Sequence, residues 1–110
     1  MASTATSIID LVKIYIQRLT DNNIPVQKAL LFGSHVNGVP RDDSDIDLAI
    51  ISTAFKGDRF SDRRMIVPFR RGLDSRIEPM PFTPDDFAEG GVLIDEIKKT
   101  GRAISVVAEV

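Results

Sequence analysis

The sequence predicts a single small α/β domain, and three observations support this class. The chain has 110 residues, 43% of them hydrophobic and 27% charged, which suits one globular domain. Apolar residues recur at helical spacing between Ile8 and Leu19, which indicates an amphipathic helix packed against a core. Two apolar segments of strand length then flank a Gly33-Ser34 turn, so helix and strand patterns occur in one short chain.

The first half of the chain predicts one helix and two strands. The helix extends from about Ser7 to Thr20, with Thr6 or Ser7 as its N-cap. Pro25 prevents its simple continuation. Ser34 can cap a short helical turn between the strands, which Gly38 or Pro40 closes. The predicted strands cover residues 26–32 and 45–51.

The second half alternates helix and strand signals. A helix over 60–70 carries arginines on its outer side, and Pro68 should kink or split it. A third strand covers 75–80, where Pro79 indicates an edge position or the strand's end. The remaining elements are a helix that begins with the capping sequence Thr83-Pro84-Asp85-Asp86, a helix over 92–99 and a short strand over 102–107.

Composition excludes several classes of protein. The chain has no cysteine and one histidine, so neither a disulfide framework nor a thiolate or His-rich metal site is possible. The net charge of −2 argues against strong nucleic-acid binding. No apolar run reaches the ~18 residues of a membrane span, and the N-terminus lacks a secretory signal pattern. We therefore expect a soluble, cytoplasmic protein.

Two aspartates at the start of the second strand are the strongest functional signal. Asp45 and Asp47 are two residues apart, so on a strand their side chains share one face, with Cα atoms roughly 6.6–6.8 Å apart. Aspartate is depleted in strands, and two at alternate positions need a reason. Ile46, Leu48 and Ile50 point the other way, into a core. This strand therefore offers a base for holding divalent cations.

Three common phosphate or metal motifs do not fit the same stretch. A P-loop requires a Gly-Lys-Ser/Thr sequence, and none follows Gly33. An EF-hand loop requires glycine and glutamate where Leu48 and Ala54 stand. The G-x-G-x-x-G spacing of a dinucleotide site is also missing here. A Gly-Ser turn followed by Asp-x-Asp remains to be explained.

This combination resembles the nucleotidyltransferase superfamily that includes DNA polymerase β, and more narrowly the minimal nucleotidyltransferases. The resemblance implies a nucleotidyltransferase fold, α/β (α+β two-layer), with a small mixed sheet and helices mainly on one face. It also implies one minimal domain over 1–110. The matching segments are Leu31-Phe32-Gly33-Ser34, Ser44-Asp45-Ile46-Asp47-Leu48, Arg76-Ile77-Glu78-Pro79 and Phe82-Thr83-Pro84-Asp85-Asp86-Phe87.

The resemblance implies metal-dependent chemistry on ATP or another NTP, with two Mg²⁺ ions about 3.5–4 Å apart. Asp45 and Asp47 would bridge the metals, and Glu78 on the third strand would supply the third carboxylate. Asp74 has the same parity but lies about 13 Å further along an extended strand at ~3.3 Å per residue. If neither Glu78 nor Asp74 serves as the third carboxylate, the resemblance implies a degenerate domain that has lost part of the catalytic site.

The same resemblance assigns nucleotide contacts to the Gly-Ser turn. Gly33 would let the backbone approach the phosphates, and Ser34 with the following amides would bind the triphosphate. Relatives often carry an arginine where the segment 35–37 reads His-Val-Asn, and Arg41 is the candidate to replace it. His35 could serve as a base, although a lone surface histidine is the ordinary interpretation.

Two arginine pairs on the predicted helix, Arg63-Arg64 and Arg70-Arg71, could meet an acidic partner or a nucleotide. The ordinary interpretation of such a pattern is a solvated helix face.

Three functions are compatible with this pattern. The first is transfer of AMP, or another nucleoside monophosphate, to an acceptor hydroxyl, for which the resemblance suggests a HEPN-type toxin as partner. The second is an antitoxin or binding module that keeps the fold and acts by contact alone. The third is adenylylation of a small molecule. The size of the chain leaves room for an acceptor site supplied by another chain or by a homo-oligomer.

Overall fold

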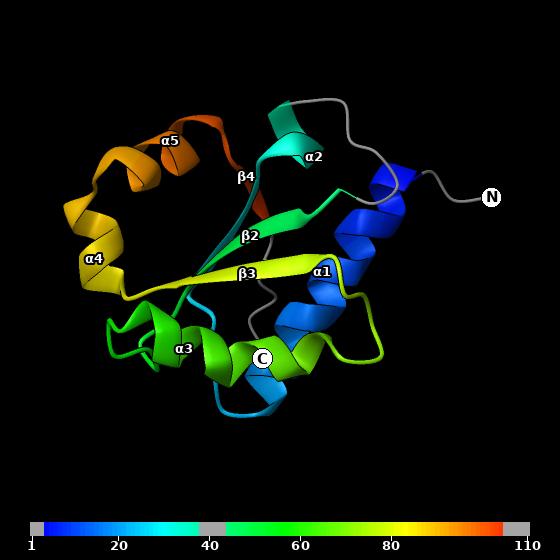
Figure 1. The fold of residues 1–110 in the computed structure, drawn as a ribbon, viewed down its shortest axis with the longest axis horizontal. Coiled ribbons are helices and arrows are strands. Elements are labelled where there is room, and N and C mark those ends of the chain that lie inside the picture. The colour runs from blue at the N-terminus through cyan, green and yellow to red at the C-terminus, as the bar shows by residue number, and fades with distance from the viewer. Residues whose placement is uncertain (1–3, 38–43, 105–110) are drawn as a thin grey trace.

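The computed structural model of the protein describes residues 4–37 and 44–104. Within them, five α-helices and one 3₁₀ helix surround a four-stranded mixed sheet, as the predicted fold class requires (Figure 1). The elements in chain order are α1 (Thr4–Asp21), β1 (Lys28–Phe32), α2 (Ser34–Asn37), β2 (Ile46–Ile51), α3 (Arg59–Ile66), η1 (Val67–Arg70), β3 (Ile77–Phe82), α4 (Pro84–Glu89), α5 (Val92–Thr100) and β4 (Arg102–Ile104).

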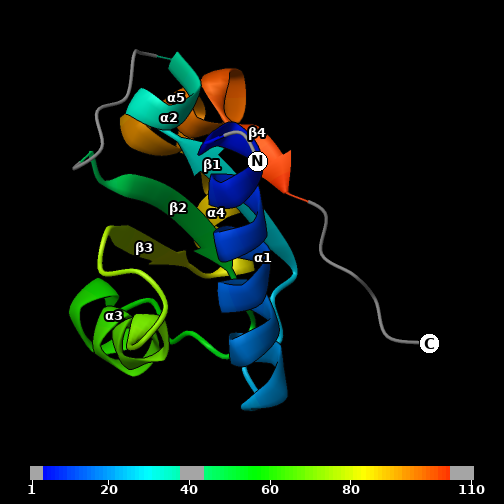
Figure 2. The same ribbon diagram turned by 90° about the vertical axis from the view of Figure 1, so that its right-hand side faces the viewer.

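The strands lie in the order β3-β2-β1-β4. β1 pairs antiparallel with both β2 and β4, whereas β2 and β3 are parallel. Parallel neighbours need a crossover connection, which here consists of α3 and η1. Figure 2 shows α3 beside β3, at the edge of the sheet. The crossover therefore places the arginine-rich helix next to the strand that carries Glu78.

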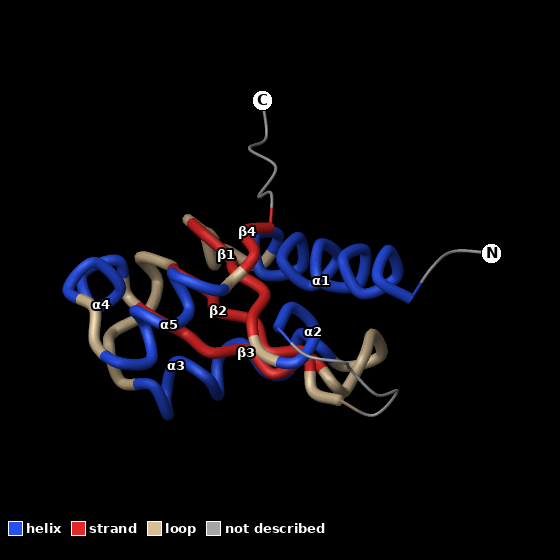
Figure 3. Tube along the Cα trace, turned by 90° about the horizontal axis from the view of Figure 1, so that it is seen from above, coloured by secondary structure: helices blue, strands red, loops and turns tan. Residues whose placement is uncertain are grey.

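Each face of the sheet is covered by a different set of helices. The larger cluster packs α1 and the end of α3 against alternate strand residues, including Leu31, Leu48 and Ile77. The smaller cluster packs α4 and α5 against the opposite face, through Ala49 and Phe82 among others. Figure 3 shows the strands between α1 on one side and α4 and α5 on the other. The larger core lies on one face, and the structure adds a second, smaller core.

The first helix is longer than its sequence pattern indicated. α1 begins at Thr4, so the predicted N-cap at Thr6 or Ser7 is wrong, because both positions lie inside the helix. Its apolar stripe is buried as predicted, and the Tyr15 hydroxyl donates to the carbonyl oxygen of Ile66 at 2.7 Å. This hydrogen bond ties α1 to the end of α3 across the larger core.

The strands begin later than predicted, because local patterns do not fix where cross-strand pairing starts. β1 begins at Lys28 rather than residue 26, and β2 begins at Ile46, immediately after Asp45. β3 covers Ile77–Phe82 rather than 75–80, so Asp74 lies outside the strand. The last strand is confirmed for 102–104, and its predicted extension to 107 falls outside the described residues.

The helix signals in the second half are confirmed. Pro68 divides the predicted helix, because α3 ends at Ile66 and continues as the 3₁₀ helix η1. The Thr83 side chain caps α4 by accepting from the Asp86 backbone amide at 3.0 Å, with Pro84 at the first helical position.

The edge strand β3 contains two prolines, and its edge position confirms the expectation from Pro79. The carbonyl oxygens of Arg76 and Phe82 accept hydrogen bonds from backbone amides at the two ends of β2. The backbone polar groups of even-numbered β3 residues therefore face β2. Pro79 and Pro81 are odd-numbered, so their backbone nitrogens, which carry no hydrogen, face away from β2 toward the outer edge of the sheet.

None of the helices within 4–37 and 44–104 is long and apolar enough to cross a membrane.

Candidate functional site

The predicted third acid lies directly beside one of the paired aspartates. Asp47 and Glu78 are cross-strand partners in the parallel β2–β3 register, and Phe32 opposes Asp47 on its other side. Asp45 comes just before β2 and is exposed, while Asp47 is half-buried. Ile46, Leu48 and Ile50 have no exposed surface, which confirms that they point into the core. The sheet therefore brings Asp47 and Glu78 together at one end of one face, and Asp45, just before β2, is close enough to act electrostatically on Asp47.

Asp47 is the electrostatically strained member of this group. Burial raises the pKa of its carboxyl group above 3.8, and the nearby charges of Asp45 and Glu78 raise it further, while His35 opposes them. Within the described residues, no hydrogen bond or ion pair reaches the carboxylates of Asp45 and Asp47. Like charges held close together are costly for the fold, and a bound cation would relieve the repulsion at Asp47.

Gly33 is fixed by the position of Asp47. Its φ is +80°, a region that favours glycine, and a Cβ atom there would lie 2.2 Å from Oδ2 of Asp47. The glycine of the Gly-Ser turn therefore serves two purposes. It lets the chain turn from β1 into α2, and it leaves room for the carboxylate.

Glu78 is already engaged by arginines from the crossover. Nη2 of Arg63 donates to Oε1 of Glu78, and Nη1 of Arg70 lies 3.9 Å from the same oxygen. Arg70 also donates to the carbonyl oxygen of Ile77 at 2.7 Å. These two arginines are not a purely solvated helix face. No local signal in the sequence indicated this contact, because it depends on the parallel pairing of β2 with β3 that brings the crossover helix against the sheet.

Asp74, the alternative third acid, has a structural partner instead. Its carboxylate accepts from Nε of Arg76 at 3.0 Å and from Nη2 of Arg76 at 2.8 Å. The side-chain hydrogen bond from Arg76 holds the pKa of Asp74 below 3.8. Because Asp74 also precedes β3, the structure favours Glu78 over Asp74 as the neighbour of Asp47.

The residues that follow Gly33 form a single short helical turn. Ser34 begins α2, and His35 lies in the same turn with Nε2 3.4 Å from the carbonyl oxygen of Ser44. His35 also acts electrostatically on Asp47, so it borders the acidic cluster. The predicted nucleotide contact Arg41 lies outside the described residues, as do the predicted turn-closing residues Gly38 and Pro40.

The donor atoms of this cluster suit a hard cation. Asp45, Asp47 and Glu78 offer carboxylate oxygens, which Mg²⁺ prefers. As the side chains stand, however, no group of three or more His, Cys, Asp or Glu residues within 4–37 and 44–104 is arranged to hold a metal ion. Glu78 would have to separate from Arg63 before its carboxylate could join those of the two aspartates.

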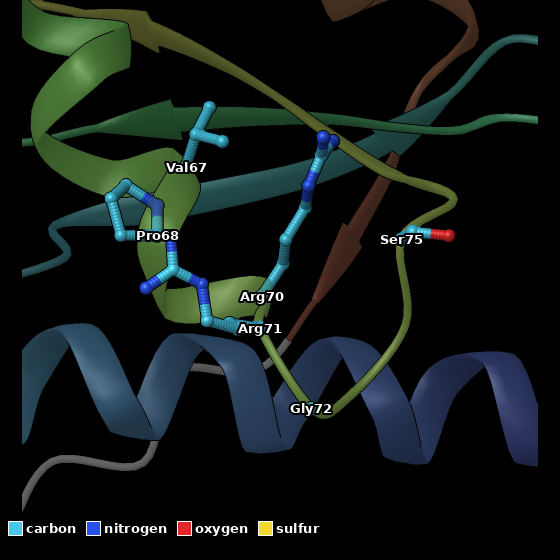
Figure 4. Close-up of a pocket in the computed structure, with 6 residues that line it drawn as sticks. All are labelled: Val67, Pro68, Arg70, Arg71, Gly72 and Ser75. Carbon is cyan, nitrogen blue, oxygen red and sulfur yellow. The ribbon is translucent and has the colours of Figure 1, made fainter.

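A pocket of about 350 Å³ lies next to this cluster but contains none of the three acids. It lies between η1 and the turn that precedes β3. In Figure 4 the Arg70 side chain extends toward β3, whereas Arg71 points away from that strand. Arg70 is therefore shared between the pocket and the acidic cluster. The pocket-lining residues are Val67, Pro68, Arg70, Arg71, Gly72 and Ser75.

Comparison with known proteins identifies the family. The family model described as Polymerase beta, Nucleotidyltransferase matches residues 15–79. This segment contains the Gly-Ser turn, the aspartate pair and Glu78. No curated protein matches the chain.

Two solved structures are similar to the chain over most of its length, each with a TM-score of 0.63. One is a Sulfolobus solfataricus protein provisionally identified as a nucleotidyltransferase, with 19% sequence identity over 94% of this chain and 87% of that chain. The other is a toxin-antitoxin solved with AMP-PNP, with 28% identity over 89% of this chain and 74% of that chain. The first likeness concerns the fold alone.

Proposed function

The chain belongs to the Polymerase beta nucleotidyltransferase family, and on that premise we propose that it transfers a nucleoside monophosphate to an acceptor hydroxyl. The observation that carries this proposal is the pairing of Asp47 with Glu78 across β2 and β3, beside Gly33 and next to Asp45. Acidic side chains that repel one another do not stabilise the fold. Next to a glycine turn, however, they suit the binding of cations and phosphates.

The proposed reaction replaces a phosphoanhydride bond of the NTP with a phosphoester bond to the acceptor. The acceptor oxygen bonds to the α-phosphorus of the NTP, and the bond from that phosphorus to the bridging oxygen of the β-phosphate breaks. Pyrophosphate leaves, and the acceptor hydroxyl loses its proton. Mg²⁺, when bound, would neutralise the phosphate charge in this exchange.

We assign cation binding to the acidic residues and triphosphate binding to the Gly-Ser turn. Asp45 and Asp47 would hold the cations, with Glu78 as the third carboxylate beside the acceptor hydroxyl. Ser34 and the amides after Gly33 would bind the triphosphate. Arg41 remains our candidate for a further phosphate contact.

We propose ATP as the first nucleotide to test and a partner protein as the acceptor. The similar toxin-antitoxin structure solved with AMP-PNP, an ATP analogue, supports both choices. A HEPN-type toxin is the partner that we propose.

The test is transfer of label from α-labelled ATP to a candidate HEPN partner in the presence of Mg²⁺. We expect Asp47→Asn and Asp45→Asn each to reduce transfer at least about 100-fold, because a neutral amide is a poor Mg²⁺ ligand. Asp10→Asn, an exposed change on α1, is the matched control and should transfer normally. Wild-type transfer by either site variant would contradict the assignment.

A second candidate function is neutralisation of the partner by contact alone. It is favoured by one observation, that the Glu78 carboxylate is paired with Arg63 and approached by Arg70. In that case Asp47→Asn should still bind the partner in a pull-down and inhibit it fully. If transfer is essential instead, the variant should bind the partner without inhibiting it.

A further inference from the structure

The Arg63–Glu78 pair suggests how the acidic cluster is kept together before a cation arrives. Glu78 lies opposite Asp47, whose carboxylate has like-charged neighbours. Arg63 reaches this position from α3, a separate element of the crossover. Its guanidinium group therefore supplies positive charge where the proposed function requires a metal ion.

Of the two arginines near Glu78, Arg63 is the one that can exchange. Arg70 is anchored to the backbone of β3 through the Ile77 carbonyl oxygen, and its side chain is 27% exposed. The Arg63 side chain is 44% exposed, and Glu78 is its hydrogen-bonding partner among the described residues. An exposed ion pair is worth little in water, so it can break when a stronger ligand for the carboxylate is present.

We propose that Arg63 is a positioning residue that competes with the divalent cation for the Glu78 carboxylate, so that cation binding releases the Arg63 side chain. This inference rests on the proposed function, because it takes Asp45, Asp47 and Glu78 as the cation site. Arg63 holds Glu78 in place beside Asp47 while the cation is absent. When the cation binds, Glu78 exchanges a guanidinium partner for a metal partner, and Arg70 keeps β3 in register.

The test measures Mn²⁺ binding to the full chain by the electron paramagnetic resonance signal of free Mn²⁺. Arg63→Met should raise the affinity about two- to fivefold, which is the range expected for removing one exposed ion pair. Arg64→Met is the matched control on the same helix, because Arg64 lies over the Phe60 ring and not at Glu78. It should leave the affinity within about 1.5-fold of wild type.

A double-mutant cycle separates competition from a general charge effect. In the Glu78→Gln background there is no carboxylate to compete for, so Arg63→Met should change Mn²⁺ affinity much less than in the wild type. Arg63→Lys keeps the charge and should bind Mn²⁺ nearly as weakly as the wild type. Circular dichroism of each variant verifies folding, which exposed substitutions should preserve.

Two results would overturn the inference. One is an unchanged or weaker Mn²⁺ affinity in Arg63→Met, and the other is an equal effect of Arg63→Met with Glu78 and with Gln at position 78. Failure of the proposed function would look different, because Asp47→Asn would then bind Mn²⁺ as well as the wild type does.

Discussion

The two ends of one sheet face have opposite roles although the same strands build both. At one end Asp47 and Glu78 stand opposite each other, and at the other Ile51 and Phe82 do, in the same β2–β3 register. The second pair is buried under α4 and α5, and the first is half-exposed with mutually repelling charges. One end therefore stabilises the domain, whereas charge repulsion at the other end, where we propose the cation site, reduces its stability.

The largest stability effect should come from the apolar end. Ile97 on α5 is 1% exposed in the smaller cluster, so Ile97→Ala should lower the free energy of unfolding by about 2–5 kcal/mol. Urea denaturation measures this change, and transfer activity per folded molecule should be preserved. Val92→Ala on the same helix is the control, because Val92 is 93% exposed and its truncation should cost little. Equal losses in both variants would mean that the second cluster contributes no core.

The glycine turn at the acidic end gives the next largest effect. In Gly33→Ala the new Cβ would overlap Oδ2 of Asp47, so we expect Mn²⁺ binding to be lost and stability to fall by about 1–3 kcal/mol. Gly72→Ala is a matched control, because Gly72 has φ +76° and open space where a Cβ would lie. Gly72→Ala introduces the strain of a positive φ at a non-glycine residue but no overlap with another side chain, so it should bind Mn²⁺ normally. If the two variants behave alike, Gly33 is required only for its backbone conformation.

The smallest effect concerns the repelled carboxylate itself, in the absence of metal. A raised folded-state pKa means that Asp47 favours the fold below pH 3.8 and that this contribution is lost as pH rises through its folded pKa. Asp47→Asn should therefore raise the melting temperature at pH 7, on the order of 1–3 °C, and the gain should shrink at acidic pH.

Asp74→Asn should change the melting temperature in the opposite direction in the same experiment. The pKa of Asp74 is lowered, so its stabilising contribution is present above pH 3.8 and lost as pH falls through the folded value. The variant should therefore melt at a lower temperature than the wild type at pH 7. A melting temperature that falls in Asp47→Asn would contradict the repulsion that we infer at the acidic end.

Local patterns were sufficient to predict the centre of the site. Alternation along β2 placed Asp47 on the face opposite Leu48, and the proline in the third strand indicated an edge. Both inferences depend only on the two-residue period of a strand and on the missing proline N–H. The choice of Glu78 came from the family resemblance, and the structure places it beside Asp47.

Long-range features could not be read from the sequence. The parallel pairing of β3 with β2 depends on how the crossover folds back, which no local pattern specifies. The contact of Arg63 with Glu78 joins residues 15 positions apart on different elements. The same holds for the smaller core, where Phe87 and Ile97 meet on the face that the site also uses. Periodicity shows which residues are apolar, but tertiary packing decides which of them meet.

The two prolines of β3 have a consequence for how another protein can approach. Strand addition needs backbone N–H donors along a free edge, and Pro79 and Pro81 remove them from the outer side of β3. Another protein therefore cannot extend the sheet at this border by regular backbone pairing, and α3 lies beside the same strand, as Figure 2 shows. Because proline has no backbone N–H, the two prolines also hinder edge-to-edge pairing of β3 between copies of the chain, the kind of pairing that builds fibrils.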